Sequence, residues 1–117
     1  MKKILQLEEL AQMALGIIVL DLLPVEFSWW AWLLLFLSPD ISFAAYFVNT
    51  RVGAFAYNIF HHKGIALTIA IAGFLLKQDI MLLAGALLFA HSSFDRLLGY
   101  GLKYKDDFKH THLGWMK

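Results

Sequence analysis

Four long apolar stretches, separated by short polar connectors, run along the chain of 117 residues. Each is close to the about 20 mainly apolar residues, within a range of roughly 17 to 25, that a helix needs to cross a bilayer. The predicted spans cover residues 5–23, 29–48, 52–76 and 80–98. Because the connectors are short, neighbouring helices should pack antiparallel. The pattern predicts an all-α integral membrane four-helix bundle, a single domain over residues 1–117 with a polar and aromatic tail at residues 99–117.

Composition agrees with this interpretation and excludes several kinds of site. Hydrophobic residues make up 60% of the chain and charged residues 16%, with a mean hydropathy of +0.63, whereas a soluble domain is nearer half apolar and a quarter charged. A net charge of +1 gives no reason to expect a nucleic-acid partner. The absence of cysteine excludes thiolate zinc sites and cysteine nucleophiles. The first apolar run contains Glu8 and Glu9 and lacks a small-residue cleavage site, so no cleavable signal peptide is expected.

The basic residues near the ends of the spans predict the orientation. In a four-span arrangement nearly all of them fall on one side, while Lys77 falls on the other and Lys63 within a span. Those on the common side are Lys2, Lys3, Arg51, Arg96, Lys103, Lys105, Lys109 and Lys117. Both termini should therefore be cytoplasmic.

Each span carries an ionisable residue in its cytoplasmic half, at the depth given by a rise of about 1.5 Å per residue. These residues are Glu8, Asp40, His61, His91 and Asp95. Such groups are costly inside a membrane and persist when they pair, line water or bind something. His91 and Asp95 are four apart and share a helix face, as do Asn58 and His61, three apart. Pro39 should kink or open the second helix beside Asp40.

Imidazoles and carboxylates without cysteine suit zinc, iron or manganese. We therefore interpret the five residues as one set of metal ligands, projecting from facing helices of the bundle. The alternative is a polar network that only fixes helix packing, which is the simpler explanation for any single residue. Glu9, His62 and Lys63 are left out, Glu9 as a solvated residue at the helix start and the other two as residues that face water or reach an interface.

The tail has two interpretations. Its tyrosines, tryptophan and lysines suit an anchor at the lipid headgroups. Alternatively, the tail is a flap over the cytoplasmic mouth of the site, in which Gly99 and Gly101 give backbone freedom and Tyr104 or His112 reaches the cluster.

Several motifs together resemble the domain of unknown function 4260 family, small bacterial membrane proteins of four predicted spans. They are Ser38-Pro39-Asp40-Ile41-Ser42, Gly53 with Tyr57-Asn58 and His61, the stretch from His91 through Asp95-Arg96 and Gly99-Tyr100-Gly101-Leu102-Lys103-Tyr104, and Phe108 with Thr111-His112-Leu113-Gly114. Glu8 fits an early Leu-x-Leu-Glu pattern. The resemblance implies the fold and a bacterial inner-membrane location, assigns no function, and gives weight to Lys103, Tyr104 and His112.

Two functions follow as hypotheses. The first is a membrane-embedded metal-dependent hydrolase that acts on a lipid or another amphiphile from the cytoplasmic leaflet, with redox chemistry at a di-iron site as a variant. Its candidate catalytic residues are Asn58, Arg96, Lys103, Tyr104 and His112, of which Arg96 or Lys103 would bind an anionic headgroup. The second is a non-enzymatic proton or solute conduit, or a binding or assembly subunit, in which the same cluster relays protons. The conduit would need a homo-oligomer, because four helices are few for a transport path.

Overall fold

The computed structural model describes residues 1–116 and has an all-α architecture. These residues contain five α-helices, a 3-10 helix and a two-stranded hairpin. The elements are α1 (Lys2–Leu22), α2 (Trp29–Leu37), η1 (Ser38–Phe47), α3 (Thr50–Phe60), α4 (Lys63–Leu75), α5 (Asp79–Leu97), β1 (His110–Thr111) and β2 (Gly114–Trp115). Residue 117, the last of the predicted tail, lies outside the described residues.

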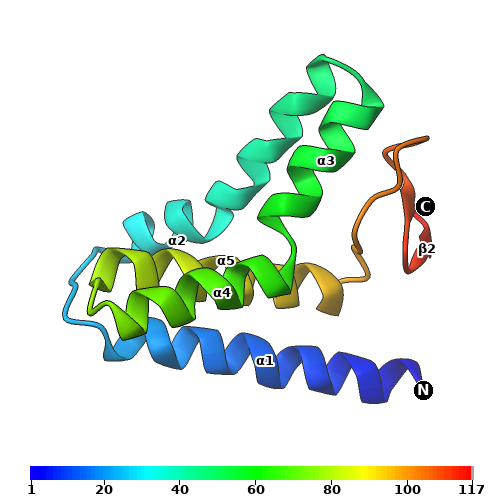
Figure 1. Ribbon diagram of the computed structural model, residues 1–117. Coiled ribbons are helices and arrows are strands. Elements are labelled where there is room, and N and C mark those ends of the chain that lie inside the picture. Colours follow the sequence, from blue (N-terminus) through cyan, green and yellow to red (C-terminus); the bar gives the residue numbers. More distant parts are fainter. Residues whose placement is uncertain (117) are drawn as a thin grey trace.

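Helices α1, α4 and α5 lie side by side, and α5 runs antiparallel to both of its neighbours (Figure 1). Small residues allow this close packing. A Cβ atom added to Gly16 of α1 would lie 2.9 Å from the Cβ atom of Ala90, and one added to Gly85 of α5 would lie 2.3 Å from the backbone nitrogen of Ala70. Leu20 and Leu87 belong to the apolar core between α1 and α5. Glycine at these positions therefore fixes the distance between the helices.

The predicted second span is helical throughout but changes type at Pro39. Proline has no N–H group to donate to the carbonyl four residues earlier, which belongs to Leu35. That carbonyl instead accepts from the backbone N–H of Ser38 and from its hydroxyl, the latter over 2.6 Å. From Ser38 onward the chain continues as the 3-10 helix η1. The break that the sequence predicted beside Asp40 is thus a switch from α to 3-10 geometry.

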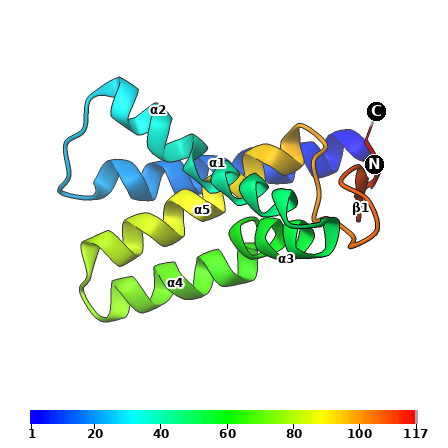
Figure 2. The same ribbon diagram turned by 90° about the horizontal axis from the view of Figure 1, so that it is seen from above.

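The predicted third span, residues 52–76, is not one helix. Helix α3 ends at Phe60, and the residue after it, His61, has a φ of −116° and a ψ of 12°, outside the helical region. The next residue, His62, is the N-cap of α4, and its Nδ1 atom accepts a hydrogen bond from the backbone N–H of Ile65. Helix α3 pairs with η1, whereas α4 pairs with α5, and the two helices diverge (Figure 2). The prediction of four continuous helices was wrong here because apolar composition does not reveal a break made by side-chain capping.

Two helical stretches of the described chain are long and apolar enough to cross a bilayer, Trp29–Phe47 and Asp79–Leu97. Helix α4 is apolar but has 13 residues, about 20 Å at the helical rise. Helix α1 is longer but carries Glu8, Glu9 and Asp21 among its apolar residues. The structure therefore supports fewer membrane-length helices than the four predicted from the sequence.

Candidate metal centre

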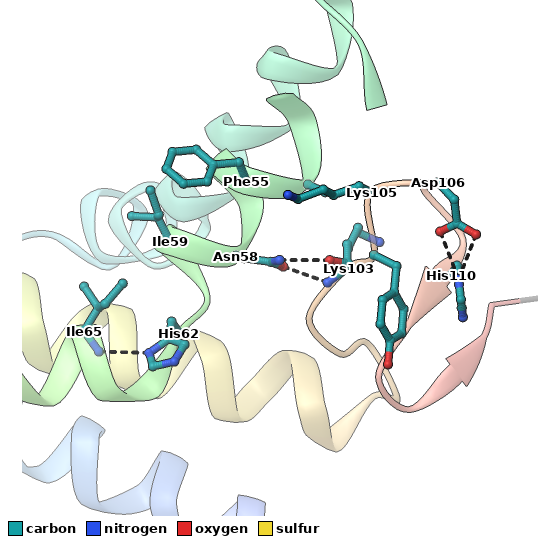
Figure 3. Close-up of a pocket in the computed structure, with 11 residues that line it drawn as sticks. Phe55, Asn58, Ile59, His62, Ile65, Lys103, Lys105, Asp106 and His110 are labelled. Carbon is teal, nitrogen blue, oxygen red and sulfur yellow. Dashed lines mark hydrogen bonds and ion pairs between the residues drawn. The ribbon is translucent and has the colours of Figure 1, made fainter. Parts of the chain in front are cut away.

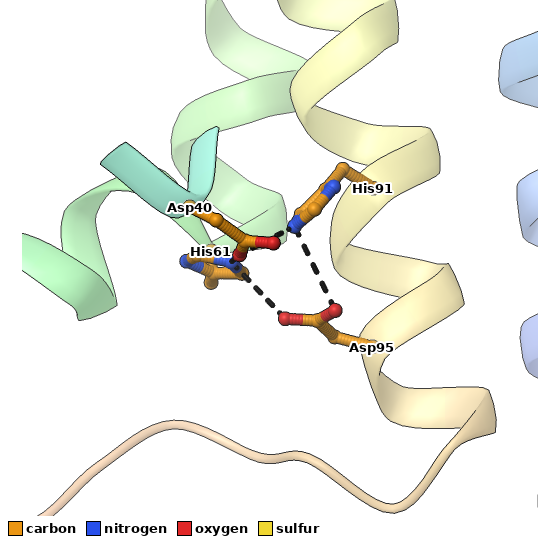
Figure 4. Close-up of side chains that lie close together, drawn as sticks. All are labelled: Asp40, His61, His91 and Asp95. Atoms are coloured by element: carbon orange, nitrogen blue, oxygen red, sulfur yellow. Dashed lines mark hydrogen bonds and ion pairs between the residues drawn. The ribbon is translucent and has the colours of Figure 1, made fainter. Parts of the chain in front are cut away.

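Four of the five predicted ligands meet at one point. Asp40 comes from η1, His61 from the end of α3, and His91 and Asp95 from consecutive turns of α5 (Figure 4). One ligand atom from each of the four side chains lies within 4.8 Å of all the others. Both imidazoles are buried, with His61 2% and His91 1% exposed, while the Asp40 and Asp95 side chains are 37% and 12% exposed. The cluster is therefore closed on the histidine side and reached through its carboxylates.

The imidazole Nε2 atoms face the carboxylate oxygens at short range. The Nε2 atom of His61 lies 3.3 Å from Oδ1 of Asp40 and 3.1 Å from Oδ2 of Asp95. The Nε2 atom of His91 lies 3.0 Å from the same Asp40 oxygen and 3.6 Å from Oδ1 of Asp95. Each imidazole thus contacts both carboxylates, and each carboxylate contacts both imidazoles.

Backbone carbonyls fix the orientation of both imidazole rings. The Nδ1 atom of His61 lies 2.9 Å from the carbonyl oxygen of Tyr57, and that of His91 lies 2.7 Å from the carbonyl oxygen of Phe36. A carbonyl oxygen only accepts, so each Nδ1 atom must carry the proton and donate. Pro39 leaves the Phe36 carbonyl available, because in 3-10 geometry its donor would be the N–H group that residue 39 lacks.

The orientation of the two imidazole rings leaves the Nε2 atoms facing other hydrogen-bond acceptors. In a neutral imidazole with a proton on Nδ1, the Nε2 atom presents a lone pair. Here both lone pairs would point at carboxylate oxygens, which are also acceptors. These contacts need a proton or a cation between the atoms: a proton on the Nε2 atom or on the carboxylate at each contact, or one metal cation. A ligating histidine characteristically donates its other ring N–H to a carbonyl or carboxylate, which is the arrangement of both rings here.

Two further residues support the centre from outside. The Tyr57 hydroxyl donates to Oδ2 of Asp95 over 3.0 Å, and the Tyr57 ring stacks on His61 with ring centroids 3.8 Å apart. Arg96 donates through its guanidinium to the carbonyl oxygen of His61 over 3.0 Å. Tyr57 belongs to one of the family motifs but was given no role from the sequence. The predicted catalytic residue Arg96 holds the backbone at the end of α3.

Glu8 lies outside the cluster and is exposed on α1. Its neighbour Glu9 faces inward instead and pairs with Lys63, which also donates to the Gln12 side chain over 2.6 Å. The predicted ligand set therefore loses Glu8, and the pair Glu9–Lys63, which sequence reasoning had set aside, connects α1 to the start of α4.

The tail folds back over the carboxylate side of the cluster. A cavity of about 270 Å³ is lined by both carboxylates together with residues of the tail. Its lining residues are Asp40, Phe43, Tyr57, Asp95, Tyr100, Lys103, Phe108 and Met116. Of the two interpretations of the tail, this contact is the one expected of a flap.

Asn58 attaches the tail to α3. Its Nδ2 atom donates to the backbone carbonyl of Lys103 over 2.8 Å, and its Oδ1 atom accepts from the backbone N–H of Lys103 over 2.7 Å (Figure 3). Lys103 itself is 4% exposed. Its ammonium group donates to the Phe108 carbonyl over 2.9 Å and lies over the Phe108 ring, 3.9 Å from the centroid. The predicted catalytic residue Asn58 is thus a docking contact for the segment that carries Lys103.

The glycines of the tail motif have structural reasons. Gly99 ends α5 with a φ of +95°, a conformation that other residues rarely adopt. A Cβ atom on Gly101 would lie 2.7 Å from the His112 ring. The Nδ1 atom of His112 accepts from the Leu102 N–H over 2.8 Å, so His112 holds the tail together instead of reaching the cluster. Tyr104 is 50% exposed and its ring lies against His110.

Two tail residues have shifted pKa values. Burial lowers the pKa of the Lys103 ammonium group below its usual 10.5, while the negative charge of Asp95 acts in the opposite direction. Partial burial lowers the pKa of His112 below 6.5, and the Arg96 guanidinium lowers it further. Both shifts mean that a positive charge on either side chain is costly in the docked tail.

Comparison with known proteins agrees with the motifs quoted above. No curated protein and no solved structure matches this chain. A family model described as Domain of unknown function (DUF4260) matches residues 2–116. Because that match spans nearly the whole chain, the protein belongs to the DUF4260 family.

Proposed function

We propose that this protein is a membrane-embedded, metal-dependent hydrolase that acts on a lipid or another amphiphile from the cytoplasmic leaflet. The observation that carries the proposal is the direction of the two Nε2 lone pairs of His61 and His91. Backbone carbonyls aim both at the carboxylates of Asp40 and Asp95, and one metal cation between these atoms would satisfy all four groups.

The separations of the ligand atoms suit one small divalent ion. Ligands held about 2.0–2.1 Å from a tetrahedral ion lie about 3.3 Å from one another. The four nitrogen–oxygen separations here run from 3.0 to 3.6 Å, with His61 facing one oxygen of Asp95 and His91 the other, and one ligand atom from each of the four side chains lies within 4.8 Å of the others. A di-iron site of the bundle type uses six protein ligands, whereas the described residues bring together four. We therefore favour a single zinc, iron or manganese ion over the di-iron variant.

The chemistry follows from the access to the site. A bound divalent ion lowers the pKa of a coordinated water and so supplies a nucleophile at neutral pH. Asp40 is the more exposed of the two carboxylates, so water would reach an ion held by these residues on the side of Asp40. Asp40 also lines the cavity beneath the tail, where a substrate would lie next to that water.

The surface of the molecule supports a bilayer environment. Large apolar side chains are exposed on several helices, including Trp29 at 78%, Phe47 at 94% and Phe74 at 70%. Exposed apolar surface on this scale needs a covering phase, and lipid is the one that the hydropathy of the helices suits. Both chain ends lie toward one end of the molecule and the 23–28 and 76–78 connectors toward the other (Figures 1 and 2). The basic residues near the chain ends make that end the cytoplasmic one in the proposal.

The test is metal-dependent turnover. Purified protein in vesicles of bacterial phospholipid is stripped of metal, reloaded with zinc, iron or manganese, and assayed by mass spectrometry for released fatty acid or headgroup. We expect turnover with at least one of the metals and none in the stripped protein.

Two variants make the assay specific. His91→Gln removes a buried ligand and should abolish turnover, whereas Glu8→Gln changes an exposed carboxylate outside the cluster and should leave it unchanged. Turnover that is equal in the stripped protein, or equal in His91→Gln, would refute the proposal. If the folded protein binds no metal, its cluster is instead a pair of imidazolium–carboxylate contacts.

A further inference from the structure

Lys103 is a buried cation whose hydrogen-bond partners carry no charge. Its ammonium group donates to the Phe108 carbonyl oxygen and, over 3.3 Å, to the Met116 sulfur. Among residues 1–116 no carboxylate lies within ion-pair distance of it. Of its three N–H donors, the third has only aromatic rings beside it, those of Phe108 and Tyr57, whose centroids lie 3.9 and 4.8 Å from the ammonium nitrogen. A buried charge without a counter-ion is costly, and an anion beside it would remove that cost.

The Lys103 ammonium group lies beside the same cavity as the carboxylates of the metal centre. Lys103 lines the 270 Å³ cavity together with Asp40 and Asp95. A divalent cation would cancel the charges of the two carboxylates, which leaves the Lys103 ammonium as the uncompensated charge of the cavity. The volume is below the about 300–1,000 Å³ of sites that enclose a drug-sized molecule. The cavity therefore suits a small anionic group instead of a whole lipid.

We propose that this cavity binds the anionic phosphate group of the substrate, held between the Lys103 ammonium and the Asp40–Asp95 side of the metal centre. The inference rests on the proposed function and names its substrate class, a phosphate-bearing amphiphile. Lysine acts as a point charge toward phosphate, and its ammonium group has no preferred plane of approach. The Asn58 contact places Lys103 by holding its backbone at both the N–H and the carbonyl.

A second cavity provides for the apolar part of such a substrate. A groove of about 680 Å³ lies along α3 and the tail, and Lys103 lines it as well (Figure 3). Phe55, Ile59 and Ile65 supply most of its apolar side chains, and Phe55 is 65% exposed. Because both cavities share Lys103, a phosphate bound at Lys103 lies next to a groove that accepts an alkyl chain.

The experiment measures binding of three probes to metal-loaded protein by calorimetry: inorganic phosphate, a short-chain alkyl phosphate and a long-chain alkyl phosphate. We expect all three to bind, with affinity rising with chain length because the groove adds apolar contact. Lys103→Met should weaken the binding of each probe about tenfold or more. Lys109→Gln, in the same tail but outside both cavities, should leave binding unchanged. Equal affinity for inorganic phosphate and the long-chain alkyl phosphate would overturn the proposed amphiphilic substrate and identify free phosphate as the ligand.

A measurement on the unaltered protein covers the case in which Lys103→Met does not fold. Inorganic phosphate should slow the chemical acylation of the Lys103 amine, read by mass spectrometry, and leave that of Lys109 unchanged. Bound metal without phosphate binding, or equal acylation of Lys103 with and without phosphate, would overturn this inference alone. If the folded protein binds no metal but still binds phosphate through Lys103, the proposed hydrolase function is overturned and the phosphate site stands.

Discussion

The attachment of the tail to α3 can be weakened by one substitution, Asn58→Ala. The Asn58 side chain makes both hydrogen bonds that join α3 to the backbone of Lys103, over 2.8 and 2.7 Å. Each such bond contributes about 0.5–1.5 kcal/mol net, so the loss of both should cost the docked tail about 1–3 kcal/mol. At 1.4 kcal/mol for each factor of ten, the population of the undocked tail should rise about 5- to 150-fold.

Hydrogen exchange of the tail amides measures this population directly. The Lys103 N–H donates to Asn58 and loses its acceptor in Asn58→Ala, so it exchanges faster whether or not the tail undocks. The His112 N–H donates to the Leu102 carbonyl within the tail and keeps its acceptor, so its exchange reports the docked tail and should quicken in Asn58→Ala by up to the factor above. Asn49→Ala is a matched control, since it removes a side-chain bond to the Val52 N–H at the other end of α3. Tail protection that is unchanged in Asn58→Ala, or lost equally in Asn49→Ala, would refute the docking role of Asn58.

Three further predictions follow from the same contacts. Tyr57→Phe removes the hydroxyl that donates to Asp95 and should lower the metal affinity of the protein about 10- to 100-fold, as measured by competition with a chelator. An unchanged metal affinity would contradict the supporting role of the Tyr57 hydroxyl. Gly85→Ala would bring a Cβ atom to 2.3 Å from the Ala70 backbone nitrogen and should destabilise the α4–α5 pair by about 1–3 kcal/mol or more. In Gly64→Ala the Cβ atom would lie 2.7 Å from the His62 ring, which can turn aside at the cost of its cap on α4, so the loss should be smaller. Equal loss of thermal stability in the two variants would refute the packing argument. The pKa of His112 is below its usual 6.5 in the docked tail, so above pH 6.5 the ring is neutral in both docked and undocked tails, and below it the undocked tail takes up the proton more readily. Hydrogen exchange of the tail, corrected for its intrinsic pH dependence, should therefore quicken below about pH 6.5 in the wild type but not in His112→Gln. The same pH dependence in both proteins would contradict this role of His112.

From the sequence, the position of the cluster along the helices was predicted better than the set of residues that form it. Counting residues along each helix placed Asp40, His61, His91 and Asp95 at a similar depth, and the structure brings the four together. Depth says nothing about rotation around a helix axis, and this is why Glu8 was included wrongly. Glu9, Gln12, Gly16 and Leu20 are spaced three and four apart on the inward face of α1, so Glu8 is turned away by about 100°.

Local breaks in the helices were partly predictable. Pro39 signals its own effect, because the missing N–H group is a property of the residue. The break at His61 and His62 was visible only as a polar interruption of an apolar run, and whether such a run bends depends on side-chain caps that form in three dimensions. The docking of the tail by Asn58 links residues 45 positions apart, which no periodicity in the sequence records.

The proposed function rests on one divalent ion bound by four side chains, those of Asp40, His61, His91 and Asp95. The most direct test is elemental analysis of protein purified without added metal, together with its thermal unfolding before and after zinc, iron or manganese is added. We predict one ion per chain in the wild type and in Glu8→Gln, none in His91→Gln, and an unfolding temperature that falls when the ion is removed. A folded wild-type protein that holds no transition metal, with an unfolding temperature unmoved by any of the three ions, would contradict the account.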